Sequence, residues 1–375
     1  MTDQELDVRS PRGTVPSAVP PFPAPVSRVI TFLTERAMSL HAAAVLRIGY
    51  GMLYLAFLLR EFPHRDEIWG PGSPWTPDLA RELFGSTGWF SILTLSDRPA
   101  YFEACYALAL VTSALFMLGW RTRAVSVLFA LVVTSFHGRD IFMTDGGDNL
   151  IVLMAEYLMF TACGRRWSLD ARRDSRRAVG SPNRRVPPSA GQQAVLVRQR
   201  LSALVHNCGM FVIAAEVCFL YGSAGLYKVQ GYLWRNGTAL HYVLGLDLFR
   251  PWPELSHLAD QHPILVAIVG YMTVLVQVAF PFVLFSRLKY VVLGLLIGMH
   301  LGIAVFLGLP VFSGAMIIAD AVFLPDRVLL SLERGGWKFG GRILRGIMPT
   351  REEPSRSTSI PRPGLPEEMT HRSPM

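Results

Sequence analysis

The chain has 375 residues, of which 51% are hydrophobic and 17% are charged, and its formal net charge is +8. Soluble globular domains carry about 25% charged residues, so this composition excludes an ordinary soluble protein and indicates a polytopic membrane protein. The positive charge does not indicate a nucleic-acid partner. The basic residues cluster in the connectors between long apolar runs, where they report membrane topology.

The chain begins with a polar, Pro-rich segment, and about eight apolar runs follow it. We expect residues 1–38 to be a disordered cytosolic N-terminus that contains no cleavable signal peptide. Each later run approaches the length of about 20 residues that a helix needs to cross a bilayer. The runs cover residues 41–60, 99–119, 124–142, 148–164, 201–226, 263–286, 290–309 and 311–330. The sequence therefore predicts an all-α bundle of about eight transmembrane helices within residues 39–332.

Basic residues alternate between the connectors of these runs. The connectors after the second, fourth and sixth runs are rich in them: Arg121 and Arg123, the Arg-rich segment 171–199, and Arg287 with Lys289. The other connectors have fewer basic residues or balance them with acids. Positively charged connectors stay in the cytoplasm, so we expect a multi-pass cell-membrane protein with both termini cytoplasmic.

Two segments show no pattern of a fold. Residues 171–199 and 333–375 are rich in Arg, Pro and Ser. We expect the first to be a flexible cytosolic linker of the kind that touches anionic lipid, and the second to be a disordered tail.

Thr76 and Pro77 mark a short helix in the connector between the first two runs. Thr76 is suited to cap a helix and Pro77 to occupy its first turn, so the sequence predicts a helix over 77–84 that lies in the membrane interface. The alternative for this Trp-rich connector is an aromatic belt at the interface.

Lys228 is the leading candidate for a catalytic residue. Lysine occurs only at Lys228, Lys289 and Lys338, and Lys228 lies where the fifth run ends in an aromatic, turn-rich segment. A lysine that loses hydration at a membrane boundary can act as a neutral base near physiological pH. The alternative is that Lys228 extends to the lipid headgroups. Trp234 and Gly237 follow in a segment that is a candidate lid over the site.

Ionisable residues inside the apolar runs are further candidates, because buried charge tends to face the bundle interior or a wet cavity. They are Arg47, Glu103, Glu156, Glu216, His300 and Asp320. Arg47 with one acid would form a structural ion pair. His300 lies between Gly298 and Gly302, so a helix or a ligand can approach it closely, and a helix-to-helix hydrogen bond is the alternative to a catalytic role.

No motif of a soluble enzyme is present. The segment Asp145-Gly146-Gly147-Asp148 lacks the Lys and Ser/Thr of a phosphate-binding loop, and its carboxylates would repel a phosphate, so it predicts a turn. The four cysteines form no CxxC pair, so we expect neither a metal site nor a disulfide framework.

Five segments, in this order and spacing, resemble the HTTM (horizontally transferred transmembrane) family, which includes the membrane domain of vitamin K-dependent gamma-carboxylase. The resemblance covers about residues 40–330. The segments are LRIGYGMLYL (46–55), LGWRTRAVSVLF (118–129), WSLD (167–170), AGLYKVQGYLWRNGTAL (224–240) and MHLGIAVFLGLPVFSGAM (299–316).

The resemblance implies a catalytic base at Lys228, assisted by His300, and a reduced quinone as cofactor. Arg47 matches a position near the start of the family's first span. Asp148 and Asn149 stand where animal carboxylases carry a histidine, and are candidates for orienting substrate. A short tail replaces the large domain that follows the membrane domain in carboxylases, so the scaffold can be shared without glutamate carboxylation.

Three functions remain open from the sequence. The first is a membrane enzyme that acts on a quinol or a secreted peptide, with Lys228 as base. The second is a non-enzymatic membrane partner in secreted-peptide maturation, export or immunity. The third is a small-molecule transporter, which the break at Gly308-Leu309-Pro310 favours.

Overall fold

The computed structural model describes residues 24–142, 144–179 and 190–331, and in these ranges it contains helices and no strands. The prediction of an all-α protein is therefore confirmed. The α-helices are α1 (Ala24–Glu35), α2 (Leu40–Glu61), α3 (Arg65–Ile68), α4 (Pro77–Thr87), α5 (Pro99–Leu118), α6 (Thr122–Arg139), α7 (Gly146–Met159), α8 (Leu169–Val179), α9 (Ala190–Gln230), α10 (Tyr232–Arg235), α11 (Ala239–Gly245), α12 (Pro253–Asp260), α13 (Pro263–Val283), α14 (Lys289–Phe306) and α15 (Pro310–Asp320). Short 3-10 helices are η1 (Phe62–His64), η2 (Ile92–Thr94), η3 (Cys163–Arg165), η4 (Asp247–Phe249) and η5 (Ala321–Phe323).

Five helical segments of the described residues are long and apolar enough to cross a membrane. They are Leu40–Ile68, Pro99–Leu118, Gln193–Gln230, Pro263–Val283 and Lys289–Phe306. A multi-span membrane architecture follows from them. The helices at the third, fourth and eighth predicted runs, α6, α7 and α15, have 18, 14 and 11 residues and are not among the five.

Helices also form in segments for which the sequence predicts no fold. In the N-terminal segment 1–38, α1 occupies Ala24–Glu35, and residues 1–23 lie outside the described residues. In the segment 171–199, α8 and the first turns of α9 replace much of the expected flexible linker, and only 180–189 are not described. Ala, Gln, Leu and Arg are good helix formers, so α9 continues smoothly from this polar stretch into its apolar part. The predicted tail 333–375 lies outside the described residues.

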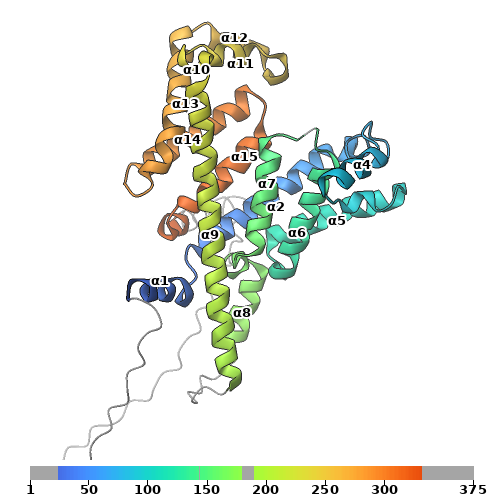
Figure 1. Cartoon of the computed structure of the whole chain (residues 1–375), viewed down its shortest axis with the longest axis vertical. Coiled ribbons are helices and arrows are strands. Elements are labelled where there is room, and N and C mark those ends of the chain that lie inside the picture. Colours follow the sequence, from blue (N-terminus) through green and yellow to red (C-terminus); the bar gives the residue numbers. More distant parts are fainter. Residues whose placement is uncertain (1–23, 143, 180–189, 332–375) are drawn as a thin grey trace, which may run out of the picture. The chain divides into compact units, whose positions relative to one another are not determined.

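The helices pack around α2 and α9. Helix α2 contacts α5, α7 and α15, α6 lies between α5 and α7, and α13 runs along α9 (Figure 1). Gly51 allows α2 and α5 to approach closely, because a Cβ atom there would lie 2.8 Å from the backbone nitrogen of Met117. Next to this contact the rings of Phe116 and Phe129 stack with their centroids 4.4 Å apart and join α5 to α6.

Helix α9 is longer than a bilayer requires. Its 41 residues span about 60 Å, twice the thickness of about 30 Å of the hydrocarbon core. One end must therefore project into water, and its first turns, with exposed Arg198 and Arg200, suit that position.

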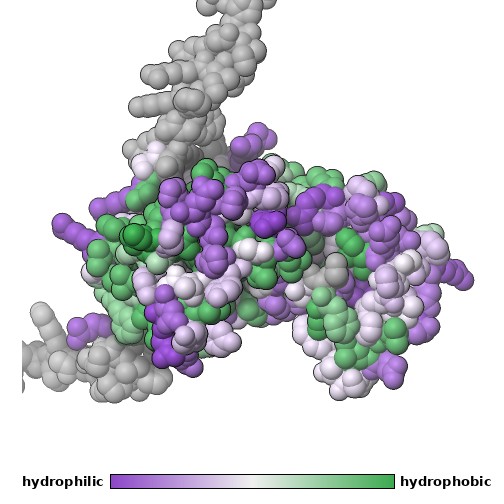
Figure 2. All heavy atoms as spheres, turned by 90° about the horizontal axis from the view of Figure 1, so that it is seen from above, coloured by the Kyte–Doolittle hydropathy of each residue, from purple (hydrophilic) through white to green (hydrophobic). Residues whose placement is uncertain are grey.

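The short helix predicted over 77–84 is present as α4, which extends to Thr87. The Thr76 hydroxyl accepts a hydrogen bond from the backbone N–H of Leu79 at 3.4 Å, and Pro77 occupies the first turn. Figure 2 looks onto the end of the molecule at which α10, α11 and α12 lie, and shows hydrophilic side chains spread among hydrophobic patches.

Five residues at the opposite end form a latch: Arg47, Gly119, Thr122, Trp167 and Asp170. The Asp170 carboxylate accepts hydrogen bonds from the Thr122 backbone N–H at 2.7 Å and from its hydroxyl at 2.8 Å. The Asp170 N–H donates to the Gly119 carbonyl at 3.1 Å. The Arg47 guanidinium donates to the Trp167 carbonyl at 2.6 Å. The latch therefore joins α2 to the α5–α6 turn and to the start of α8.

The backbone at the latch is strained, and hydrogen bonds keep it in this conformation. Trp167 and Arg121 adopt left-handed conformations with φ of 47° and 44°, which side-chain-bearing residues rarely adopt. Gly119 has φ of 70°, and a Cβ atom there would lie 1.7 Å from Nη1 of Arg47, so only glycine fits. The Arg121 N–H donates to Asp170 at 3.0 Å, which fixes the turn.

We expect Asp170→Ala to lower the free energy of unfolding by about 2–3 kcal/mol, since it leaves two backbone N–H groups without their acceptor. Thermal unfolding in detergent at pH 7 measures this loss. Asp174→Ala is the matched control, because Asp174 is exposed on the same helix and its removal should change stability by less than about 0.5 kcal/mol.

The contribution of Asp170 should also depend on pH. Burial raises the pKa of Asp170, but the hydrogen bonds from Thr122 and Arg121 outweigh burial and lower this pKa below its usual value. A carboxylate whose pKa is lowered in the folded state stabilises the fold at pH values above its unfolded-state pKa of about 4. This stabilisation is lost as the pH falls through the folded-state pKa. The stability difference between wild type and Asp170→Ala should therefore shrink below about pH 4. A constant difference down to pH 2 would contradict this account.

Candidate functional site

Lys228 lies in the last turn of α9 and has no acidic partner. Its side chain is half-buried, and its Nζ donates a long hydrogen bond of 3.4 Å to the carbonyl of Ala224. The same Nζ lies 5.4 Å from the centroid of the Trp234 ring, which comes from α10. Among the described residues no carboxylate forms an ion pair with Lys228. The cation therefore has an aromatic contact in place of a counter-ion.

The turn after α9 positions Trp234 over Lys228. The Gly231 N–H donates to the Lys228 carbonyl at 3.0 Å and ends the helix, and Gly231 then adopts an extended conformation before α10. Gly237, with φ of 72°, turns the chain into α11. A Cβ atom at Gly237 would lie 3.1 Å from the Tyr271 hydroxyl, which itself donates to the Arg235 carbonyl at 2.9 Å. These contacts fold α10 and α11 against α13, and of the two predicted residues Trp234 contacts Lys228 while Gly237 contacts Ala267 and Tyr271.

A second, fully buried group joins three helices deeper in the bundle. The Tyr221 hydroxyl from α9 donates to Asp320 Oδ2 from α15 at 3.0 Å and lies 3.0 Å from Nε2 of His300 from α14. Because the hydroxyl hydrogen serves Asp320, Nε2 of His300 acts as donor to the Tyr221 oxygen. Nδ1 of His300 and Oδ1 of Asp320 are buried without a hydrogen-bond partner in the described part of the chain. We call these residues the Tyr221 network.

Aromatic rings shield the Tyr221 network. The Tyr221 ring meets Phe280 edge to face, with centroids 5.1 Å apart, and the His300 ring meets Phe312 at 5.6 Å. In such apolar surroundings an unsatisfied polar atom costs free energy. Nδ1 of His300 and Oδ1 of Asp320 are therefore available to a proton or to a small polar ligand.

Lys228 and the Tyr221 network are neighbours along α9 but do not touch. Lys228 follows Tyr221 by about two helical turns, or roughly 10 Å, and both lie on the same face of α9. No hydrogen bond connects Lys228 to His300 among the described residues. Of the predicted pair, Lys228 thus lies at the end of α9 and His300 lies buried in the bundle. Tyr221 is an additional member of this group that was not evident from the sequence.

Arg47 lies outside this site. It belongs to the latch, where its Nη2 bonds to the Trp167 carbonyl while Nε and Nη1 have no hydrogen-bond partner in the described part of the chain. No acid lies within ion-pair distance of Arg47 in the described ranges, so the structure contains no ion pair of the kind expected for it. Its role there is to hold α2 against the strained turn.

Asp148 and Asn149 also lie apart from Lys228, at the start of α7. The simple turn predicted over 145–148 is wrong, because Gly146 to Asp148 form the first turn of α7. A capping box begins this helix: the Asp145 side chain accepts from the backbone of Gly147 and Asp148, and Asp148 Oδ2 accepts from the Asp145 N–H at 2.9 Å. The Asn149 amide donates to the Asp145 carbonyl at 3.1 Å. Both residues therefore help α7 to begin.

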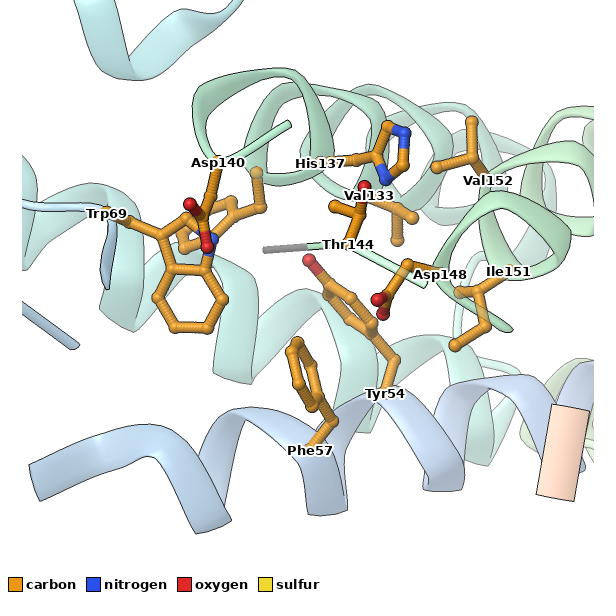
Figure 3. A pocket seen from close by; sticks show the side chains of 11 residues that line it. Tyr54, Phe57, Trp69, Val133, His137, Asp140, Thr144, Asp148, Ile151 and Val152 are labelled. Atoms are coloured by element: carbon orange, nitrogen blue, oxygen red, sulfur yellow. The ribbon is translucent and has the colours of Figure 1, made fainter. Parts of the chain in front are cut away.

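A cavity lies beside Asp148, between α2, α6 and α7 (Figure 3). Its volume is about 40 Å³. Its lining residues are Tyr54, Phe57, Trp69, Val133, Phe136, His137, Asp140, Thr144, Asp148, Ile151 and Val152. The sequence analysis did not identify this cavity. One feature of the sequence indicates this cavity: the titratable run His137-Gly138-Arg139-Asp140 at the end of an apolar segment.

No protein-family model, curated protein or solved structure matches this chain. The resemblance to the HTTM family, and the roles it implies for Lys228 and His300, therefore stay predictions. Within residues 24–142, 144–179 and 190–331 no cluster of three or more His, Cys, Asp or Glu residues is arranged to hold a metal ion.

We expect Tyr221→Phe to destabilise the fold by about 1–3 kcal/mol, although the ring keeps its packing. The loss of one hydroxyl leaves the partner atoms of His300 and Asp320 buried and unsatisfied. Thermal unfolding in detergent measures the effect. Tyr227→Phe on the same helix is the matched control, because the Tyr227 side chain is 80% exposed. Equal behaviour of the two variants would show that the network contributes nothing to stability.

Proposed function

We propose that this chain is an HTTM-like membrane enzyme in which Lys228 acts as the base on a quinol or on a secreted peptide at the extracytoplasmic face. The observation that carries the proposal is the environment of Lys228: half-buried at the end of a membrane helix, beneath Trp234 and without a carboxylate partner. A paired acid would hold the proton on the amine, whereas a desolvated, unpaired amine can release and accept it.

The aromatic residues around Lys228 support a flat or apolar substrate. Tyr227 and Tyr232 are 80% and 68% exposed beside the Trp234 ring. Ring faces at a membrane boundary suit both a quinol ring and the side chains of a peptide. A reduced quinone is therefore the cofactor that we propose, and the bilayer is the medium from which it would enter.

The Tyr221 network supports a proton-handling role. His300 and Asp320 each keep one buried atom free of hydrogen bonds. Ionisable groups are rare within membranes and commonly mark proton relays. In the proposed enzyme His300 assists Lys228 by accepting or returning a proton through an intervening water.

The topology that we propose has about eight spans, both termini in the cytoplasm and Lys228 on the opposite side. It is supported by the Arg-rich connectors, by the position of α8 next to the latch, and by the projecting first turns of α9. Helices α6, α7 and α15 would complete the bundle as shorter spans.

The test is native mass spectrometry with lipid extraction on the detergent-purified chain. We expect a quinone to co-purify with wild type and to be lost or reduced at least about tenfold in Lys228→Ala, because substrate and base share one site. Lys289→Ala is the matched control, since Lys289 starts α14 and lies 5.2 Å from its neighbouring ring, Tyr290. A quinone retained equally by both variants would contradict a site at Lys228.

Lys228→Arg separates a base from a fixed charge. Arginine stays protonated and cannot accept a proton, so we expect turnover of the co-purified quinol to be lost while the quinol remains bound. Turnover of the quinol by the variant at the wild-type rate, with dioxygen supplied as the electron acceptor, would exclude Lys228 as base. A co-purifying peptide or partner protein in place of a quinone would favour the non-enzymatic role in peptide maturation, export or immunity.

A proton-coupled transporter is the second candidate function. Gly308, with φ of 67°, breaks the chain between α14 and α15, and His300 and Asp320 lie on the two helices that meet there. Interrupted helices with intramembrane ionisable residues are typical of transporters. In proteoliposomes carrying a pH dye, a transporter would lose proton flux in Asp320→Asn and keep it in Lys228→Ala. The proposed enzyme would show no flux in any variant.

A further inference from the structure

Asp140 is a buried carboxylate without a partner, and it lines the cavity between α2, α6 and α7 (Figure 3). Its residue is only 7% exposed. No hydrogen bond or ion pair reaches its side chain from the residues that the structure describes. A buried, unpaired carboxylate is costly, so the cavity favours an occupant that donates hydrogen bonds or carries positive charge.

Among the described residues no cation forms an ion pair with Asp140, although the buried Arg139 guanidinium lies close enough to attract its carboxylate. Arg139 is adjacent in sequence, but its Nη2 is directed to the Gly70 carbonyl at 3.1 Å, and it forms no ion pair in the described part of the chain. Asp148 brings a second carboxylate to the same cavity, with only Oδ2 used for the helix cap. The cavity therefore presents more acidic than basic groups.

Aromatic rings form the rest of the wall. Phe57 meets Trp69 edge to face at 5.7 Å, and Tyr54 lies 5.9 Å from Phe57. Figure 3 shows Tyr54 and Phe57 reaching from α2 toward the space that Trp69, Asp140 and Asp148 border. Ring faces attract organic cations, and this attraction grows when the cation leaves water.

We propose that this cavity binds a primary alkylammonium group, with Asp140 as its counter-ion, Asp148 as a second acceptor, and Tyr54, Phe57 and Trp69 as an aromatic cage. The group could belong to the ethanolamine headgroup of a lipid or to a free amine, which offer the same chemistry. This inference stands on residues separate from Lys228 and does not depend on the proposed reaction.

Ligand number and charge exclude other occupants. A cavity of about 40 Å³ has room for an ethylammonium tip. Calcium takes 6–8 oxygen ligands, and magnesium takes an octahedral set with several waters, which mostly apolar aromatic walls do not provide. An anion would be repelled by both carboxylates.

The first experiment measures thermal unfolding of the purified full chain with ethylammonium chloride, with sodium chloride at equal ionic strength, and with ethanol as the neutral analogue. We expect ethylammonium alone to raise the unfolding midpoint in a saturable way, by about 2–4 °C. The rise should disappear in Asp140→Asn and persist in Asp247→Asn, the matched control, whose side chain is 94% exposed. A rise of equal size in Asp140→Asn, or with ethanol, would overturn the proposal.

A second variant keeps the test valid if Asp140→Asn fails to fold. Asp148→Asn removes the other charge but retains an oxygen that can accept the Asp145 N–H of the helix cap. We expect it to fold and to weaken the response to ethylammonium at least about threefold in half-saturating concentration. An unchanged half-saturating concentration would overturn the role of the cavity.

Lipid nanodiscs distinguish the two sources of the amine. Native mass spectrometry of wild type from discs of phosphatidylethanolamine should show retained lipid that is absent in Asp140→Asn and in discs of phosphatidylcholine, if the headgroup is the occupant. A response to ethylammonium without retained phosphatidylethanolamine assigns the cavity to free amines. If wild type shows no response to ethylammonium and also retains no lipid, the proposed site is refuted.

Discussion

The architecture depends on one buried cation. Arg47 lies fully buried on α2 and forms no ion pair among the described residues, and the Trp167 carbonyl accepts a hydrogen bond from its guanidinium. Trp167 provides that carbonyl only because its backbone takes a left-handed turn, and Asp170, three residues later, then binds the turn at 119–122. Segments that are far apart in the sequence thereby set the positions of α2, α5 and α6 relative to one another.

Three of the five segments on which the family resemblance rests supply the residues of this latch, so these residues have a structural role. LRIGYGMLYL contributes Arg47, LGWRTRAVSVLF contributes Gly119 and Thr122, and WSLD contributes Trp167 and Asp170. The remaining two segments contain Lys228 and His300. The latch contacts therefore have a structural role, and Lys228 and His300 lie outside the latch.

Lys228 and Asp140 carry charges of opposite sign, and neither forms an ion pair among the described residues. Lys228 has an aromatic contact and no acid, which suits a base that must exchange its proton. Asp140 has aromatic neighbours and no base, which suits the recognition of a cationic group. The Tyr221 network is satisfied on one side only, because Nδ1 of His300 and Oδ1 of Asp320 are buried without a hydrogen-bond partner in the described part of the chain.

The sequence alone determined the helical class, the approximate helix positions, the capping at Thr76, and the rarity of lysine, because each depends on composition or on neighbours within a few residues. It did not predict α1, or α8, where helix propensity outweighed a polar, Arg-rich composition. Only the tertiary structure decided that Tyr221 joins His300 to Asp320, that Arg47 binds a carbonyl instead of an acid, and that Asp140 faces a cavity. These contacts join residues tens to hundreds of positions apart, and they depend on helix rotation and approach, which local sequence does not encode.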